Sequence, residues 1–160
     1  RRQRQMCIRD SYWTQHCWGV TCVNDMEAML SYLPISTDNK DQALADLVRC
    51  YERMMMRSHT NGGYVNLLDE CWKMCEKFNV NIVIMYDHVS CKNVGGLHGL
   101  FEDQARERGI HLIWIPHDVM DPRTVSRREM REAFNQYMTT VLREEPLDPT
   151  LLDYEDNLSW

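Results

Sequence analysis

The sequence predicts an α/β domain of the flavodoxin-like, three-layer kind, in which a small parallel sheet is flanked by helices. Two apolar, β-branched runs at 82–87 and 110–115 indicate buried strands. Amphipathic helical patterns at 64–78, 96–108 and 126–143 alternate with them, and short strand–helix–strand connections are typical of parallel units. With 160 residues, 44% of them apolar, the chain can bury one core and little more.

The first part of the chain has weaker signals. Residues 19–23 form a short β-prone run that is a candidate third strand. The polar residues after it can cap a helix over 26–33, which Pro34 would end. Apolar residues at helical spacing then predict a second helix over 38–56.

The helix predicted at 64–78 follows a turn at 61–63. One face of it is apolar and consists of Val65, Leu68, Cys71, Trp72 and Cys75. Because that face has to be buried in any case, core packing is the favoured role of its two cysteines.

The C-terminal elements carry clear end signals. Gly109 follows the helix at 96–108 as a C-cap. Ser126 and Glu129 have the spacing of a capping box and mark the start of the last helix.

Three regions are expected along the chain. Residues 1–11 lack an apolar period and a stretch long enough for a signal peptide, so we expect a non-native leader without core contacts. Residues 12–143 form the flavodoxin-like domain, and residues 144–160 are an acidic tail for which no regular structure is expected. The chain is therefore expected to be the C-terminal part of a longer protein.

Charge and cysteine content narrow the class of protein. The formal net charge is −6 although four arginines lie among the first ten residues, so the rest of the chain is more acidic still. Such a surface repels phosphate, and we expect no nucleic-acid partner; we also expect no membrane partner. Seven cysteines without a signal sequence indicate a reducing compartment and a cytoplasmic location.

Cys91 is the leading candidate for a functional residue. It follows the strand at 82–87 and precedes a glycine-opened helix, where open α/β sheets bind ligands and where a helix start favours a thiolate. Two functional roles are open. Cys91 could be a nucleophile paired with His88, beside Asp87, or a metal ligand. A loop cysteine without a role is an equally weighted alternative.

Further residues at the same sheet edge are candidates for lining a pocket. They are His88, Ser90, Lys92, Gly95, Gly96, His117 and Asp118. The two glycines let the helix approach the sheet and leave room beside the cysteine for a bulky cofactor. A dinucleotide site is disfavoured, because the first glycine of that fingerprint falls on Val94. For His117 and Asp118 a solvated loop position is the favoured interpretation.

Several of these segments together resemble the C-terminal region of the 2-hydroxyacyl-CoA dehydratase D-component family, to which class I benzoyl-CoA reductase subunits also belong. They are Asp87-His88-Val89-Ser90-Cys91-Lys92, the strand at 110–115, and Asp121-Pro122-Arg123 with Ser126 and Glu129. The resemblance covers about residues 12–143. Its most specific part is the Ser-Cys-Lys loop after a strand, followed about thirty residues later by Asp-Pro-Arg.

The resemblance implies flavodoxin-like domains in which three cysteines from two domains hold a [4Fe–4S] cluster. The last of these cysteines lies in the motif that contains Cys91, and the other two belong to an upstream domain that this chain lacks. Cys17 and Cys22 do not lie where replacements would be expected. Three thiolates leave one iron open to take a substrate hydroxyl.

The activity implied by the resemblance is that of an anaerobic lyase. An ATP-dependent activator protein supplies one electron, and a 2-hydroxyacyl-CoA loses water through a ketyl radical. The partners implied are a related dehydratase subunit in a heterodimer, the activator and the acyl-CoA substrate. The fragment alone is expected to be inactive. A class I benzoyl-CoA reductase-type subunit is the alternative within the family, and a non-catalytic accessory or nucleotide-binding α/β domain is the alternative of another class.

Overall fold

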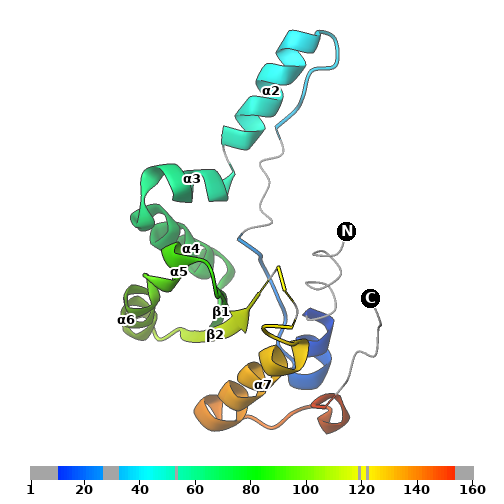
Figure 1. Cartoon of the computed structure of the whole chain (residues 1–160), viewed down its shortest axis with the longest axis vertical. Helices are drawn as coiled ribbons and strands as arrows, with labels where there is room; N and C mark the ends of the chain where they lie inside the picture. Colours follow the sequence, from blue (N-terminus) through cyan, green and yellow to red (C-terminus); the bar gives the residue numbers. More distant parts are fainter. Residues whose placement is uncertain (1–10, 27–32, 53, 119, 122, 154–160) are drawn as a thin grey trace. The chain divides into compact units, whose positions relative to one another are not determined.

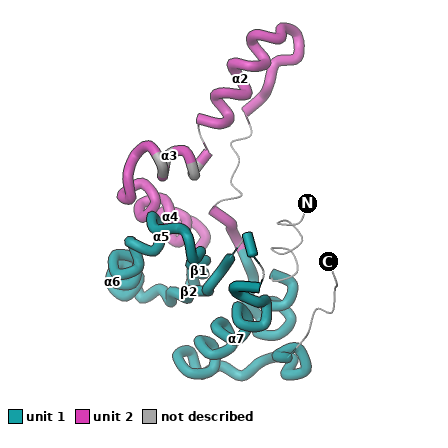
Figure 2. Tube along the Cα trace, viewed as in Figure 1, with its two compact units in different colours: residues 1–22, 81–160 teal, residues 23–80 magenta. Residues whose placement is uncertain are grey.

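The computed structural model describes residues 11–26, 33–52, 54–118, 120–121 and 123–153. The chain divides into two compact units, residues 1–22 with 81–160 and residues 23–80 (Figure 2). Nearly all of the predicted leader and most of the predicted helix at 26–33 lie outside the described residues, so the leader and the predicted domain boundaries stay predictions.

The first unit contains the predicted parallel sheet. Strands β1 (Ile82–His88) and β2 (His111–His117) pair in parallel, from Ile82 opposite His111 to His88 opposite His117 (Figure 1). The alternation of apolar runs with helices therefore predicted both the strands and their direction.

The candidate third strand at 19–23 is wrong, because residues 19–25 have no regular structure. Residues 11–18 are helical, and the helix ends at Gly19, where φ is +72°. The amides of Gly19 and Val20 donate to the carbonyls of Gln15 and Thr14, at 3.0 and 3.2 Å. The β-prone run begins as the C-terminal cap of a helix, which removes two of its amides from any sheet.

Helices cover both faces of the sheet, which gives the predicted three layers. Along β2, Ile113 and Ile115 are buried in a cluster with residues of α7 (Arg127–Tyr137). Trp114 lies between them and so points to the opposite face, where its ring meets Phe101 of α6 (His98–Arg108) edge to face at 6.1 Å. The α/β class and the flavodoxin-like arrangement are confirmed.

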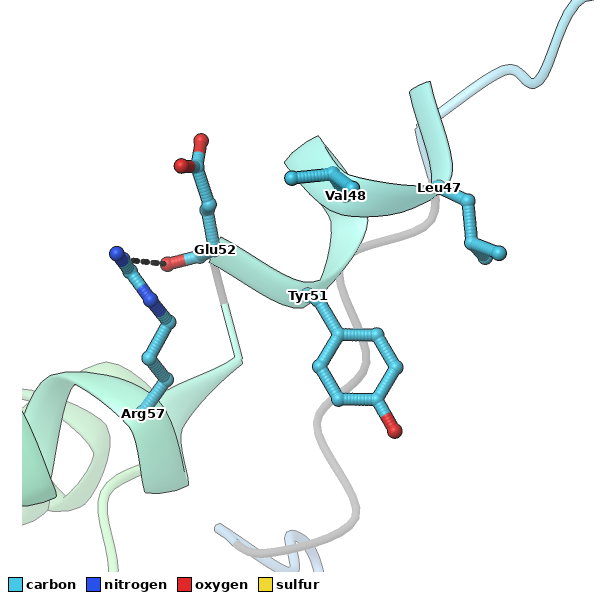
Figure 3. A pocket seen from close by; sticks show the side chains of 5 residues that line it. All are labelled: Leu47, Val48, Tyr51, Glu52 and Arg57. Atoms are coloured by element: carbon cyan, nitrogen blue, oxygen red, sulfur yellow. Dashed lines mark hydrogen bonds between the residues drawn. The ribbon is translucent and has the colours of Figure 1, made fainter. Parts of the chain in front are cut away.

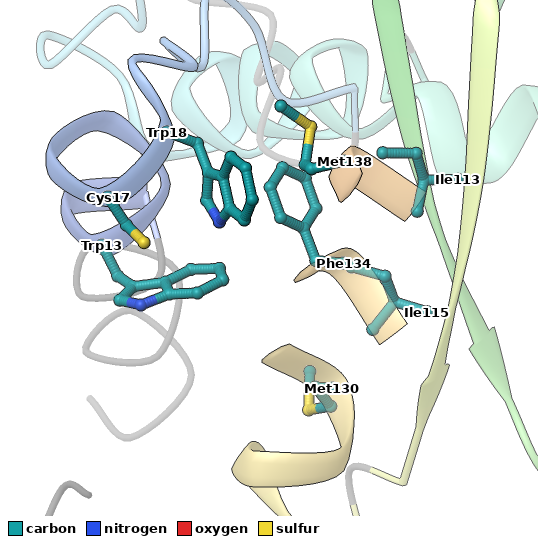
Figure 4. Packing of buried hydrophobic residues seen from close by; sticks show 8 residues of the cluster. All are labelled: Trp13, Cys17, Trp18, Ile113, Ile115, Met130, Phe134 and Met138. Atoms are coloured by element: carbon teal, nitrogen blue, oxygen red, sulfur yellow. The ribbon is translucent and has the colours of Figure 1, made fainter. Parts of the chain in front are cut away.

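The core of this unit joins the helical residues 11–18 to α7 and β2 (Figure 4). Its buried members are Trp13, Cys17, Trp18, Ile113, Ile115, Met130, Phe134 and Met138. Both tryptophan N–H groups of this core have acceptors: Trp18 Nε1 donates to Asn135 Oδ1 at 2.8 Å, and Trp13 Nε1 donates to the Leu151 carbonyl at 2.9 Å. These two indoles are thus buried without an unpaired donor.

The described part of the acidic tail is ordered against this core. The Leu147 amide donates to the Cys17 carbonyl at 2.7 Å, and residues Pro149–Leu151 form a 3-10 helix. Leu151 and Leu152 pack on the buried cluster. The sequence did not predict this, because the acidic composition of the segment masked two leucines that supply apolar contact.

The predicted capping box of α7 is confirmed. Ser126 Oγ accepts from the Glu129 amide at 3.2 Å, and the Ser126 amide donates to Glu129 Oε2 at 2.6 Å. These hydrogen bonds, first that of the Ser126 amide, lower the pKa of Glu129. After Tyr137 the helix continues as a π-helical turn, Met138–Leu142.

Replacing Ser126 by alanine is expected to lower the free energy of unfolding by about 1 kcal/mol, because an orphan amide of the first helical turn loses its acceptor. Urea denaturation followed by circular dichroism measures the change. The control is Thr140→Ala, which removes a hydroxyl that donates to the Gln136 carbonyl within the same helix and should change stability by less than about 0.5 kcal/mol. The depressed pKa of Glu129 means that its share of the cap is present at neutral pH and is lost as the pH falls through that pKa. Equal stability of Ser126→Ala and the wild type at neutral pH would contradict the assignment.

The second unit consists of helices, without a strand among its described residues. They are α2 (Lys40–Glu52), α3 (Met55–Gly62) and α4 (Tyr64–Phe78). In place of the single helix predicted at 38–56 there are two helices, α2 and α3, and Met54 directly before α3 has an extended backbone. Helix α4 has the predicted bounds and ends at Asn79 in the left-handed conformation, φ 51°.

The buried face of α4 is nearly the predicted one. Leu67, Leu68, Cys71, Trp72 and Cys75 are buried, whereas Val65 is 48% exposed. The core role predicted for Cys71 and Cys75 is confirmed, with 1% and 5% of their surface exposed.

None of the helices in the described part of the chain is long and apolar enough to cross a membrane.

Candidate functional site

Cys91 lies at the carboxyl edge of the sheet, as the sequence predicted. It follows the end of β1 by three residues and is the N-cap residue of α5 (Lys92–Gly95). The Cys91 amide donates to the His88 carbonyl at 2.8 Å, and its carbonyl accepts from the Gly95 amide at 3.0 Å. The residue is half-buried, and both of its backbone polar groups are engaged within the loop.

The helix after Cys91 differs from the prediction. A helix from about residue 96 was expected, but the chain forms the one-turn helix α5 and then α6 from His98. A helix of four residues has a small dipole, so stabilisation of a thiolate by a long helix start does not apply to Cys91.

His88 is oriented by the residue next to the cysteine. The Ser90 amide lies 3.1 Å from His88 Nδ1, and the Ser90 hydroxyl lies 3.0 Å from the same nitrogen. Because an amide N–H can only donate, Nδ1 is the acceptor and the proton of the neutral ring is on Nε2. Ser90 therefore fixes the tautomer of His88.

The two strand-end histidines are brought together by the parallel register. His88 and His117 lie opposite each other, and their ring centroids are 5.9 Å apart with the rings edge to face. Burial, and then the neighbouring His88, lower the pKa of His117, while the Asp118 carboxylate opposes this shift. His117 is thus held neutral at a lower pH than an ordinary histidine.

Asp118 begins a tight turn rather than projecting freely. Its Oδ1 accepts from the amides of Met120 and Asp121, at 2.8 and 3.1 Å, and these bonds lower its pKa. Asp121 in turn pairs with Arg123, whose Nη2 lies 2.7 Å from Asp121 Oδ2. The Asp and Arg of the Asp-Pro-Arg motif thus bind each other.

The two glycines after the cysteine have different roles. A Cβ at Gly96 would lie 3.2 Å from the Lys92 carbonyl oxygen, a tight contact that favours glycine at the end of α5. A Cβ at Gly95 would meet nothing nearer than the Asp87 carboxylate at 4.0 Å. Of the two, only Gly95 fits the expected open space, and Lys92 is exposed beside it.

Sequence reasoning missed a contact that closes the loop. His98, at the start of α6, stacks on Trp114 of β2 with ring centroids 3.6 Å apart and 17° between the planes. His98 Nε2 also lies 3.3 Å from Asp87 Oδ1. A signal was present, since Trp114 alternates with two buried isoleucines and must face the side of the sheet that α6 covers.

The other described cysteines differ in their burial. Cys17, Cys71 and Cys75 are buried, Cys22 is exposed and Cys50 is half-buried. Burial, followed by the Asp148 carboxylate, raises the pKa of Cys17, so it stays a thiol. Within the described ranges no group of three or more His, Cys, Asp or Glu side chains could hold a metal ion.

A surface pocket of about 350 Å³ lies elsewhere, in the second unit (Figure 3). It is lined by Leu47, Val48, Tyr51, Glu52 and Arg57. The Arg57 guanidinium donates to the Glu52 carbonyl at 3.2 Å beside it. None of the predicted site residues lines this pocket, so the sheet edge remains the candidate site.

The family profile of 2-hydroxyglutaryl-CoA dehydratase, D-component, matches residues 11–138. The chain belongs to this family. The match includes β1, the Cys91 loop, β2 and the Asp-Pro-Arg motif, so the whole sheet edge described above is a D-component structure. Among the curated proteins and the solved structures, none matches the chain.

Membership in the D-component family supports a role as a dehydratase-type subunit. The resemblance seen in the sequence is therefore confirmed at the level of the family.

Proposed function

We propose that this chain is the C-terminal part of an iron–sulfur 2-hydroxyacyl-CoA dehydratase subunit, in which Cys91 is one thiolate ligand of a [4Fe–4S] cluster. The observation that carries the proposal is the place of Cys91: a half-buried cysteine at the carboxyl edge of a parallel sheet in a D-component chain. Ligands of open α/β sheets collect at that edge.

The residues at this sheet edge can supply one ligand of the cluster, the thiolate of Cys91. Among the described residues, no group of three or more His, Cys, Asp or Glu side chains could hold a metal ion by itself. Iron–sulfur clusters need several thiolates, so the remaining ligands would come from a domain upstream of this chain in the full-length subunit. Gly95 and the exposed face of α5 leave space beside Cys91 for the rest of that site.

When bound, the cluster would supply low-potential electron transfer and an open iron as a Lewis acid. The chain's own residues would then hold the cluster and orient the side chains around it. Cys91 anchors the group, Ser90 fixes the tautomer of His88, and His117 is neutral at this edge and able to accept a proton. The anionic Asp118 is tied into its turn and stabilises the loop after β2.

The proposed partners follow from the same activity. They are a related dehydratase subunit in a heterodimer, an ATP-dependent activator protein and a 2-hydroxyacyl-CoA, and the proposed location is the cytoplasm of an anaerobic cell. A class I benzoyl-CoA reductase-type subunit would use the same cysteine, so assays with 2-hydroxyacyl-CoA and aromatic acyl-CoA substrates are needed to separate the two.

The 160-residue chain alone is expected to bind no intact [4Fe–4S] cluster, because it provides one matched ligand. Anaerobic reconstitution with iron and sulfide, followed by desalting and analysis of both elements, measures this. The full-length subunit treated in parallel should retain about four irons and four sulfides, the stoichiometry of the cluster. Stoichiometric iron and sulfide on the isolated chain would contradict the division of ligands, and a full-length subunit without iron would favour the non-catalytic accessory domain.

A further inference from the structure

We infer that Asp87, His98 and Trp114 form a clamp that holds the loop carrying Cys91 in place. Asp87 lies in β1 before the loop, His98 is the first residue of α6 after it, and Trp114 lies in β2. The three residues therefore tie both ends of the loop to the sheet. The clamp stands on these contacts alone, whereas its role in positioning a cluster ligand rests on the proposed function.

Two contacts make the clamp. The imidazole of His98 stacks on the Trp114 indole with centroids 3.6 Å apart, close and nearly parallel. His98 Nε2 lies 3.3 Å from Asp87 Oδ1 without an aligned hydrogen bond among the described residues, so this is a contact between two charges only when the imidazole is protonated. About a third of each of the two polar side chains is exposed, 34% for His98 and 39% for Asp87, which weakens the charge contact relative to the stack.

The loop between the two anchors is otherwise held by backbone hydrogen bonds, such as that of the Val89 amide to the His117 carbonyl at 3.1 Å, and by the buried Leu97. Val89 and Ser90 are exposed, and α5 is a single turn with an exposed Lys92 and Asn93. The Asp87 carboxylate also lies against the end of α5, 4.0 Å from where a Cβ on Gly95 would be. Loss of the clamp should therefore loosen the loop while the sheet stays paired.

The charge contact and the stack can be removed separately. Asp87→Asn and His98→Phe each remove the charge contact, and the phenyl ring keeps an aromatic face for Trp114. His98→Ala removes both contacts. The matched control is His111→Phe, which changes a histidine at the opposite end of β2, where its ring meets that of Tyr137 instead of the loop.

Two measurements on the 160-residue chain test the clamp. At about pH 5, where a histidine imidazole is protonated, amide hydrogen exchange of the segment 89–97 should become about twofold faster with Asp87→Asn or His98→Phe and about fivefold faster with His98→Ala. The double variant Asp87→Asn/His98→Phe should also be about twofold faster, because each of its two changes removes the same contact. Exchange in β1 and β2 and the melting temperature should stay close to those of the control.

The second measurement follows the rate at which the Cys91 thiol is alkylated. Iodoacetamide labelling followed by peptide mass spectrometry should show faster alkylation of Cys91 in the same order of variants, with the exposed Cys22 as internal reference. Unchanged exchange and alkylation in all four variants, or equal changes in His111→Phe, would overturn the clamp. Neither readout involves iron, so failure of the clamp is distinct from failure of the cluster assignment, which the iron content of Cys91→Ser decides.

Discussion

Replacing Cys91 by serine in the full-length subunit is expected to abolish turnover of the acyl-CoA substrate. A serine hydroxyl is a poor substitute for a thiolate toward iron, so the cluster would be lost or destabilised together with the electron transfer that it supports. Anaerobic assay of dehydration in the presence of the related subunit, the activator protein and ATP measures the effect. The expected activity is that of the background without the subunit.

The controls for this variant are Cys71→Ala and Cys75→Ala. Both cysteines are buried in α4, so these changes remove small packed side chains and should cost about 1 kcal/mol of stability each, without loss of turnover at moderate temperature. A Cys91→Ser subunit as active as these two controls would show that Cys91 at the sheet edge is not required for turnover.

Replacing Phe134 by alanine should lower the free energy of unfolding by about 3–5 kcal/mol. The ring is 1% exposed and lies in the cluster of helix 11–18, α7 and β2, where it meets Trp13 edge to face at 5.7 Å (Figure 4). Removing it leaves a cavity between the tryptophans of helix 11–18 and the isoleucines of β2, which cannot close without moving the helix. Denaturant unfolding monitored by tryptophan fluorescence measures the loss.

Val141→Ala is the matched control for the core variant. Val141 lies in the π-helical turn that continues α7, and 53% of its surface is exposed, so its truncation should change stability by less than about 0.5 kcal/mol. Similar losses in the two variants would show that the cluster around Phe134 is not the core of this unit.

The sequence signals that correctly predicted the bounds of helices depend on residues that lie close together in the chain. Helix α4 has the predicted bounds, Gly109 caps α6 in the left-handed conformation at φ 66°, and the Ser126–Glu129 box starts α7. In each case the residues that decide the structure are close together in the sequence. Such signals can be read from one chain without knowledge of its tertiary contacts.

The wrong predictions have tertiary causes. The run at 19–23 has strand propensity, but its first amides cap the helix before it, and that helix is fixed by Trp13 and Cys17 contacts with residues 147–151. Those partners are far away in the sequence, as the separation of 138 positions between Trp13 and Leu151 shows. Propensity alone cannot anticipate contacts of that range.

One part of the candidate site could be predicted from local sequence signals, and the other part depends on tertiary contacts. The position of Cys91 followed from the end of a strand, which the sequence marks. The pairing of His88 with His117 and the stack of His98 on Trp114 depend on the register of two strands and on where α6 begins. The short helix α5 shifted that beginning from about residue 96 to His98, which is enough to change which side chain faces the sheet.

The iron and acid-labile sulfide content of the purified full-length Cys91→Ser subunit tests the central claim most directly. Each is compared with the wild type and with Cys71→Ala after the same anaerobic reconstitution, and the visible absorption of the cluster is recorded beside them. The proposed ligand role predicts that iron, sulfide and absorption are lost or strongly reduced in Cys91→Ser and retained in Cys71→Ala. Unchanged iron, sulfide and absorption in Cys91→Ser would contradict it.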